Sequence, residues 1–215
     1  MSNVNPTTIY LDCDDTILYS SEMVIRILNQ RYGENKTISD LTDWFYQSIV
    51  PGVSQQEILG IYDSEEFWNE VELNPEFLEV FKKLKNCFNW VIISRGKEEN
   101  IRLKTKFIGQ HLGIPVRGLP IKNSTDSCTS KKEVDMYRGI QIDDNMGCLK
   151  GSNASIKILL QHGRNLPWNQ PSPHEDNLYI ARDWKEIGEA LEFFLRCPSM
   201  VEKCYGEDSG EGYTD

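Results

Sequence analysis

Residues 8–18, TIYLDCDDTIL, join a short apolar run to a cluster of carboxylates. The run Thr8–Leu11 is β-branched and apolar between polar flanks, which is typical of a buried strand in a parallel sheet. Asp12, Asp14 and Asp15 follow where this strand should end. Open α/β sheets bind ligands just beyond the carboxyl ends of their strands. Like charges packed there are costly unless a cation or a catalytic task compensates, so this stretch is the candidate active site.

The composition is that of an ordinary globular protein of 215 residues, long enough for one sizeable core with an inserted subdomain. Its formal net charge of −10 argues against nucleic-acid polymers and anionic membranes as partners. Part of this charge lies in residues 205–215, which we expect to form a disordered acidic tail. No apolar run approaches a membrane span, and residues 1–8 lack the apolar segment of a secretory signal. The six cysteines show no C-x-x-C spacing, which disfavours a zinc site and favours a cytoplasmic chain with reduced thiols.

Apolar periodicity in the second part of the chain alternates between helices and strands. Helical spacing of apolar residues predicts helices over residues 75–84, 98–112, 131–137 and 184–195. Short apolar runs predict further strands over residues 90–93, 114–121, 139–142, 155–160 and 178–180. Strands that alternate with helices favour an α/β fold with a doubly wound parallel sheet and right-handed crossovers.

The segment that follows the first strand has a different character. Residues 20–32 carry apolar side chains at helical spacing, and the sequence beyond them is aromatic and acidic without a clear strand. We therefore predict that residues 19–73 form a small, mainly helical cap. This cap would be inserted between the two parts of the α/β core, residues 1–18 and 74–204.

Polar side chains follow two other predicted strands. Ser94 comes directly after the apolar run 91–93, where its hydroxyl and the next backbone N–H suit a phosphate oxygen. Asp143 and Asp144 follow residues 140–142 in the same way. The chain has no G-x-G-x-x-G or Walker loop, so these groups are the candidates for holding a phosphate or a cation.

The pattern Asp-x-Asp-x-Thr at Asp12, Asp14 and Thr16 resembles motif I of the haloacid dehalogenase-like (HAD) phosphatases. In the same order along the chain, Ser94 resembles motif II and the pair 143–144 resembles motif IV. The resemblance implies that Asp12 attacks phosphorus and that Asp14 acts as general acid and base. A carboxylate nucleophile divides one difficult displacement into two easier ones, through an aspartyl-phosphate.

A carboxylate that attacks an anionic phosphate needs a hard divalent cation to offset the repulsion, and Mg²⁺ suits oxygen ligands. The resemblance implies that Asp12, the backbone carbonyl of Asp14, Asp143 and Asp144 hold this ion. Which residue of the motif IV pair binds the metal directly stays open.

The phosphate itself would be held by Ser94, the Arg95 amide and a lysine, because a lysine point charge can balance the nucleophile and the phosphate. Motif III of the family is a lysine shortly before the motif IV strand. The spacing favours Lys131, while Lys132 and Lys122 remain alternatives.

Within the superfamily, five segments resemble the cytosolic and mitochondrial 5′(3′)-deoxyribonucleotidases: residues 66–68, 72–75, 91–94, 131–134 and 142–144. That resemblance implies a small phosphomonoester substrate, a nucleoside 5′-monophosphate, and a helical cap whose aromatic residues sandwich the base. The candidate base-binding residues are Trp44, Phe45, Phe67 and Trp68. Each of them is equally compatible with the hydrophobic core of the cap.

Two positions depart from the nucleotidase pattern. Asp15 stands where glycine is usual, and Arg95 stands where a second small hydroxyl residue is more common. Both departures concern the identity of the substrate more than the chemistry. The alternatives are therefore a phosphatase for another small ester such as a sugar phosphate, or a non-catalytic binding protein, and a homodimer stays open.

Overall fold

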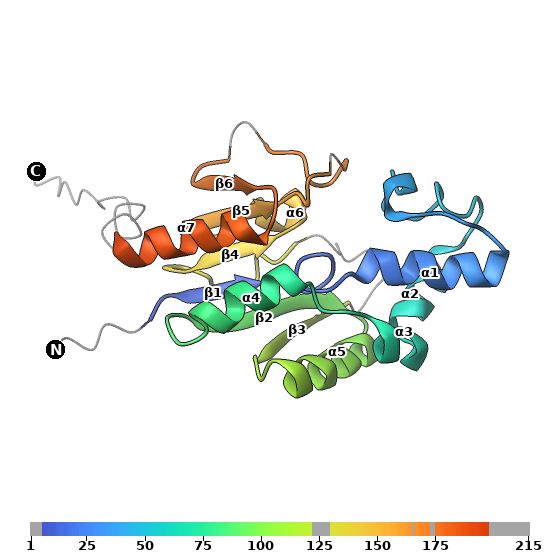
Figure 1. Cartoon of the computed structure of the whole chain (residues 1–215), viewed down its shortest axis with the longest axis horizontal. Helices are drawn as coiled ribbons and strands as arrows, with labels where there is room; N and C mark the ends of the chain where they lie inside the picture. Colours follow the sequence, from blue (N-terminus) through green and yellow to red (C-terminus); the bar gives the residue numbers. More distant parts are fainter. Residues whose placement is uncertain (1–5, 122–129, 165, 173–174, 198–215) are drawn as a thin grey trace, which may run out of the picture.

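Figure 1 shows the computed structural model of the chain, which describes residues 6–121, 130–164, 166–172 and 175–197. Six strands form one sheet in the order β3-β2-β1-β4-β5-β6, and all neighbours pair in parallel. The strands are β1 (Thr8–Leu11), β2 (Asn89–Gly96), β3 (Val116–Pro120), β4 (Ile140–Asp143), β5 (Ile156–Leu160) and β6 (Leu178–Ala181). The predicted doubly wound parallel sheet is confirmed.

The first strand, β1, lies in the centre of the sheet and pairs with β2 on one side and β4 on the other. The chain winds outward from β1 to β3, returns to the centre, and winds outward again from β4 to β6. The strand order therefore reverses beside β1. In open α/β sheets a crevice forms at the carboxyl ends of the strands at such a point, and Asp12 follows β1 directly at this position.

Helices cover one face of the sheet (Figure 1). They are α4 (Pro75–Leu84), α5 (Glu98–His111) and α7 (Trp184–Arg196). Trp184 at the start of α7 is fully buried, and its ring centroid lies 4.9 Å from that of Phe77 in α4. Its indole Nε1–H donates to the backbone oxygen of Thr16 at 2.8 Å. This contact ties α7 to the loop that carries the candidate catalytic aspartates.

The other face of the sheet is covered by an irregular segment where a helix was predicted. Residues 131–137 form turns, with single hydrogen bonds such as Val134 N to Lys131 O at 3.0 Å. Asp135 accepts the Tyr137 N–H at 3.1 Å, a local bond that competes with helix formation. The helix prediction was therefore wrong here, because side-chain contacts to other parts of the chain hold the segment instead of its own backbone ladder. Val134 is nonetheless buried against the sheet.

Between β1 and α4 the chain forms a helical segment beyond the carboxyl end of β1, at the right of Figure 1. Its elements are α1 (Ser20–Tyr32), the 3₁₀ helix η1 (Ile38–Asp40), α2 (Gln55–Tyr62) and α3 (Glu65–Glu70). The mainly helical content of this cap agrees with the sequence pattern, while its borders at residues 19 and 73 stay predictions. The predicted tail, residues 205–215, lies outside the described residues.

Across the described ranges, no helix combines the length and the apolar character that a membrane crossing requires. The short helix α6 (Met146–Leu149) completes the core between β4 and β5.

Candidate active site

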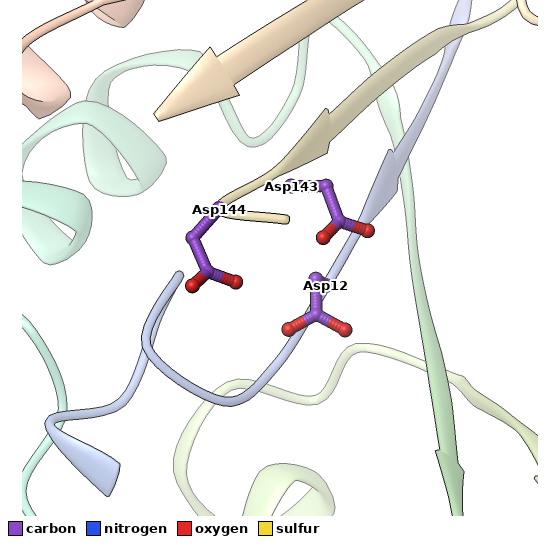
Figure 2. A group of neighbouring side chains, drawn as sticks. All are labelled: Asp12, Asp143 and Asp144. Carbon is purple, nitrogen blue, oxygen red and sulfur yellow. The ribbon is translucent and has the colours of Figure 1, made fainter. Parts of the chain in front are cut away.

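Three carboxylates converge at the centre of the sheet edge (Figure 2). Asp12 follows β1, and its backbone N–H donates to Ile142 O at 2.9 Å, which continues the pairing between β1 and β4. Asp143 is the last residue of β4, and Asp144 follows it. Each of the three aspartates offers a carboxylate oxygen, and these atoms lie within 4.8 Å of one another.

Lys131 supplies the cation that faces this cluster. Its ammonium group donates to Asp12 and, at 2.7 Å, to Asp143 Oδ2. Burial alone would lower the pKa of Lys131, but the two carboxylates hold it well above its ordinary value, so the group is charged. Lys132 is exposed, and Lys122 lies outside the described residues. Lys131 is therefore the predicted lysine, among the described residues, that contacts the carboxylate cluster.

The charge balance of the cluster fits a divalent cation. Burial raises the pKa of Asp12 to about 7, although Lys131 opposes this shift, and burial with the neighbouring carboxylates raises the pKa of Asp144 well above its usual range. Three carboxylates, of which Asp143 and Asp144 are buried, therefore face a single ammonium group, and a hard cation on oxygen ligands would relieve their mutual repulsion. The donor set consists only of carboxylate oxygens, which Mg²⁺ prefers.

Asp14 points to a different partner. Its Oδ1 accepts a hydrogen bond from Ser20 Oγ at 2.9 Å, and its Oδ2 accepts one from Lys104 Nζ at 2.5 Å. Lys104 also donates to Ser94 Oγ at 2.6 Å and is fully buried. Ser94 itself lies inside β2, not after its end.

Lys104 was not among the sequence candidates, although a signal existed. It lies on α5 between the inward-facing Ile101 and Ile108, at spacings of three and four residues. A lysine on the apolar side of a helix is rarely buried without a partner. Such a position predicts a buried carboxylate nearby, which the structure identifies as Asp14.

The Arg95 guanidinium, at the cavity lining, binds two groups of the protein itself. This group is paired with Glu133 and donates to the backbone oxygen of Ser130 at 2.9 Å. Both partners flank Lys131 in the sequence. The Arg95 side chain therefore fixes the turn that brings Lys131 into the site.

A cavity of about 570 Å³ opens above these groups. Its lining includes predicted catalytic, metal-binding and phosphate-binding residues: Asp12, Asp14, Ser94, Lys131, Asp143 and Asp144. Its walls come from the helical cap and from the loop after β5, and they include Trp44, Phe45, Tyr46, Ile58, Leu59, Tyr62 and Trp168. The cavity combines an acidic floor with an aromatic and aliphatic wall.

The four aromatic candidates separate into two pairs. Trp44 and Phe45 line the cavity and are 40 % and 49 % exposed. Phe67 and Trp68 are buried in the hydrophobic core and are absent from the cavity lining. The prediction that Phe67 and Trp68 contact a base is therefore corrected, because α3 turns this pair inward.

Trp168 is a cavity residue that the sequence did not reveal. Its ring packs edge-on against Trp44 with centroids 5.1 Å apart. It lies in an irregular loop, where no periodicity distinguishes an inward from an outward side chain. Together the two indoles form part of the cavity wall.

No protein-family model matches the sequence, and no curated protein matches it either. The structure, in contrast, resembles solved HAD-superfamily proteins. A haloacid dehalogenase-like hydrolase from Streptococcus pneumoniae superposes with a TM-score of 0.57 at 16% identity, covering 88% of this chain and 98% of that one. A putative phosphatase from Clostridium difficile gives 0.61 at 11% identity over 90% and 100% of the two chains.

A third similar structure is a putative HAD hydrolase from Bacillus subtilis that is bound to magnesium. It superposes with a TM-score of 0.56 at 14% identity, covering 87% of this chain and 99% of that one. At these identities the likeness concerns the fold. The chain has the HAD-like α/β fold, and its aspartate cluster can hold a metal ion.

Proposed function

We propose that the protein is a Mg²⁺-dependent phosphomonoesterase that works through an aspartyl-phosphate. One observation carries this proposal: Asp12 lies at the carboxyl end of the central strand, grouped with Asp143 and Asp144 and facing Lys131, on the floor of a cavity. The proposed nucleophile, the proposed metal ligands and the proposed phosphate-binding lysine thus lie next to one another on the cavity floor. The HAD-like fold supports the same reading.

The cation site would be formed by carboxylates of Asp12, Asp143 and Asp144, with the backbone carbonyl of Asp14 added by the family resemblance. Bound Mg²⁺ would supply positive charge to the phosphate oxygens. Lys131 adds charge from the protein side, and Ser94 offers a hydroxyl to the same oxygens. Most of the rate acceleration in phosphoryl transfer comes from charges positioned in this way.

The covalent step begins when a carboxylate oxygen of Asp12 forms a bond to phosphorus and the bond to the leaving oxygen breaks. Asp14 gives its proton to that leaving oxygen. Asp14 then takes a proton from a water molecule, whose oxygen attacks phosphorus and breaks the bond to Asp12. Free phosphate and an intact Asp12 carboxylate result.

Lys104 and Ser20 hold the Asp14 carboxylate in place for this task, since each donates a hydrogen bond to a different oxygen of it. Because Lys104 also contacts Ser94, it links the acid/base residue to the phosphate-binding hydroxyl. We regard Lys104 as a positioning residue.

For the substrate we propose a nucleoside 5′-monophosphate. The volume and the aromatic wall of the cavity support this choice, because Trp44, Phe45 and Trp168 offer faces or edges to a base. The described cysteines are free, in keeping with a cytoplasmic location as part of the proposal. A homodimer is compatible with this function.

A sugar phosphate is the second candidate, because polar residues of the cap also reach the cavity. These residues are Asp43, Gln55, Gln56 and Asp63. Carboxylates and amides suit the hydroxyl groups of a sugar. Such a substrate would need the same floor and little from the aromatic wall.

Phosphate release from a panel of ribo- and deoxyribonucleoside monophosphates and sugar phosphates tests the proposal. Each assay is run with Mg²⁺, with EDTA, and with the Asp12→Asn variant as the blank. Mg²⁺-dependent release that favours nucleotides supports the whole proposal, and release from sugar phosphates alone leaves the chemistry and replaces the substrate. Turnover by Asp12→Asn at more than about one thousandth of the wild-type rate would remove Asp12 as the nucleophile.

A further inference from the structure

Four side chains form a continuous hydrogen-bonded chain along the cavity wall, called here the hydroxyl chain: Asp15, Ser21, Tyr46 and Tyr62. Asp15 accepts the Ser21 backbone N–H at 2.8 Å and also accepts the Ser21 hydroxyl. The Ser21 Oγ lies 3.0 Å from the Tyr46 hydroxyl, which lies 3.1 Å from the Tyr62 hydroxyl. The hydroxyl chain therefore joins the loop of the catalytic aspartates to helix α2 of the cap.

The carboxylate of Asp15 decides which oxygen is the donor in each hydrogen bond of the hydroxyl chain. A carboxylate only accepts hydrogen bonds, so the one hydroxyl proton of Ser21 is given to Asp15. Ser21 Oγ must then accept from Tyr46, and Tyr46 must accept from Tyr62. The Tyr62 hydroxyl thus directs its hydrogen to Tyr46, and only the lone pairs of its oxygen remain for a ligand. Among the described residues, no group other than the Tyr46 hydroxyl makes a hydrogen bond with the Tyr62 hydroxyl.

Two residues of the hydroxyl chain have a backbone conformation that side chains disfavour. Asp15 has φ 51° and Tyr46 has φ 59°, both in the left-handed region that favours glycine and disfavours a bulky side chain. Such conformations persist only where surrounding contacts require them, and they cluster at functional sites. At the other end, the backbone oxygen of Tyr62 accepts hydrogen bonds from Trp68 Nε1 and Asn100 Nδ2, both at 2.8 Å.

We propose that Tyr62 is a specificity-determining acceptor, whose oxygen takes a hydrogen bond from an N–H or O–H group on the leaving group of the substrate. This inference rests on the proposed function, because the phosphate must be seated at Asp12 for the leaving group to extend toward the cap. An acceptor that a bound substrate covers discriminates between ligands, since an analogue without the donor leaves the acceptor unpaired. Asp15 makes the Tyr62 oxygen an acceptor through the two intervening hydroxyl groups of Ser21 and Tyr46.

The test uses pairs of nucleotides that differ by one donor. Suitable pairs are cytidine 5′-monophosphate with its analogue lacking the 4-amino group, adenosine 5′-monophosphate with purine riboside 5′-monophosphate, and ribo- with 2′-deoxyribonucleotides. We expect the wild type to favour the donor-bearing member of one or more pairs by about tenfold in kcat/KM, the value of one hydrogen bond. Tyr62→Phe should abolish that preference, because it lowers kcat/KM for the donor-bearing member of the pair and not for its partner.

Tyr32→Phe is the matched control. Tyr32 also makes one hydrogen bond within the cap, to Glu57 at 2.7 Å, but it lies outside the cavity lining. Tyr32→Phe should leave the preference within every nucleotide pair unchanged. Thermal unfolding followed by circular dichroism verifies that each variant is folded.

Asp15→Asn provides a sharper readout than loss of function. The amide oxygen can still accept the Ser21 N–H, while the amide nitrogen donates to Ser21 Oγ. Ser21 then donates to Tyr46, Tyr46 donates to Tyr62, and Tyr62 offers its proton to the cavity. The donor preference should therefore disappear or reverse in this variant, which a merely structural role of Asp15 does not predict.

The outcomes separate this inference from the proposed function. If Tyr62→Phe lowers kcat/KM equally for both members of every pair, or lowers it for none, the acceptor role is wrong while the phosphatase stands. If the wild type hydrolyses no compound, the proposed function fails, and titration calorimetry of the same pairs against wild type and Tyr62→Phe decides the inference. A donor-specific loss of affinity would support it, and equal or absent binding would overturn it.

Discussion

Lys104 Nζ lies 2.5 Å from Asp14 Oδ2, although 90 residues separate the two in the sequence. Burial opposes the charge on Lys104, but the Asp14 carboxylate more than compensates, so the pKa of Lys104 is raised and the ammonium stays charged. The acid/base residue of the proposed reaction is thus held by a fully buried cation that also binds Ser94.

Replacing Lys104 by methionine should impair both stability and turnover. The change keeps the length of the side chain but leaves Asp14 without its charged partner. We expect a loss of about 3 kcal/mol in the free energy of unfolding, at the low end for a broken buried pair because Asp14 remains 30% exposed. Since Asp14 would lose its orientation, kcat should fall by about a hundredfold while KM changes little.

Lys106→Met on the exposed side of α5 is the control for Lys104→Met. Lys106→Met removes the same charge from the same helix. It should change neither the free energy of unfolding nor kcat. Urea unfolding and steady-state kinetics measure the two effects. A Lys104→Met variant that loses stability but keeps its kcat would limit Lys104 to a structural role.

Mg²⁺ should stabilise the protein in the absence of any substrate. A ligand that binds only the folded state at about a hundred times its Kd adds about 2.7 kcal/mol, which corresponds to several degrees in Tm. Asp144→Asn should remove this increment. The same change should raise Tm in EDTA, because burial and neighbouring carboxylates raise the pKa of Asp144 and so make its charge unfavourable in the metal-free fold.

Thermal unfolding of wild type and Asp144→Asn, with Mg²⁺ and with EDTA, measures both changes. Asp176→Asn, at an exposed position outside the cavity lining, serves as the control. An unchanged Mg²⁺ increment in Asp144→Asn would exclude Asp144 from the metal site.

His162 should make stability depend on pH. Its ring contacts the backbone oxygen of Asp15, and burial lowers the pKa of His162 from 6.5 to about 4. Between these two pH values the unfolded chain binds a proton that the folded chain does not, so this contribution is complete above pH 6.5 and is lost as the pH falls toward 4.

His162→Gln should therefore lose less stability than the wild type over this window. Glutamine keeps an N–H donor for Asp15 and does not titrate. Free energies of unfolding in urea at pH 7, 5.5 and 4.5 provide the comparison. Parallel curves for the two proteins would show that His162 titrates alike in both states.

The sequence predicted the site best where an apolar strand pattern is followed directly by ionisable side chains. A buried apolar run followed directly by carboxylates marks a strand end, and parallel pairing of β1 with β4 then brings Asp12 close to Asp143 without further information. The same reasoning failed for residues 131–137, because local helical spacing of apolar residues does not report the long-range contact of Lys131 that holds this segment.

Contacts between distant elements account for what the sequence left out. Lys104 meets Asp14 only because α5 packs beside β2, and Trp168 meets Trp44 only because the loop after β5 reaches the cap. Aromatic content alone does not say which rings a short helix turns inward. Phe67 is therefore a core residue although its neighbours in sequence resemble a substrate-binding cap.

The substitutions Phe45→Ala and Phe67→Ala should affect different properties, substrate binding in the first case and stability in the second. Phe67 is fully buried and packs 5.1 Å from the rings of both Tyr62 and Trp68, so Phe67→Ala should cost about 3–5 kcal/mol of unfolding free energy. Phe45 is 49% exposed at the cavity, so Phe45→Ala should change stability by less than about 0.5 kcal/mol. It should instead raise KM for nucleoside monophosphates by about tenfold, the value of one stacking contact, and leave p-nitrophenyl phosphate unaffected. Equal kinetic loss for both substrates would place Phe45 in the catalytic geometry and remove it from base recognition.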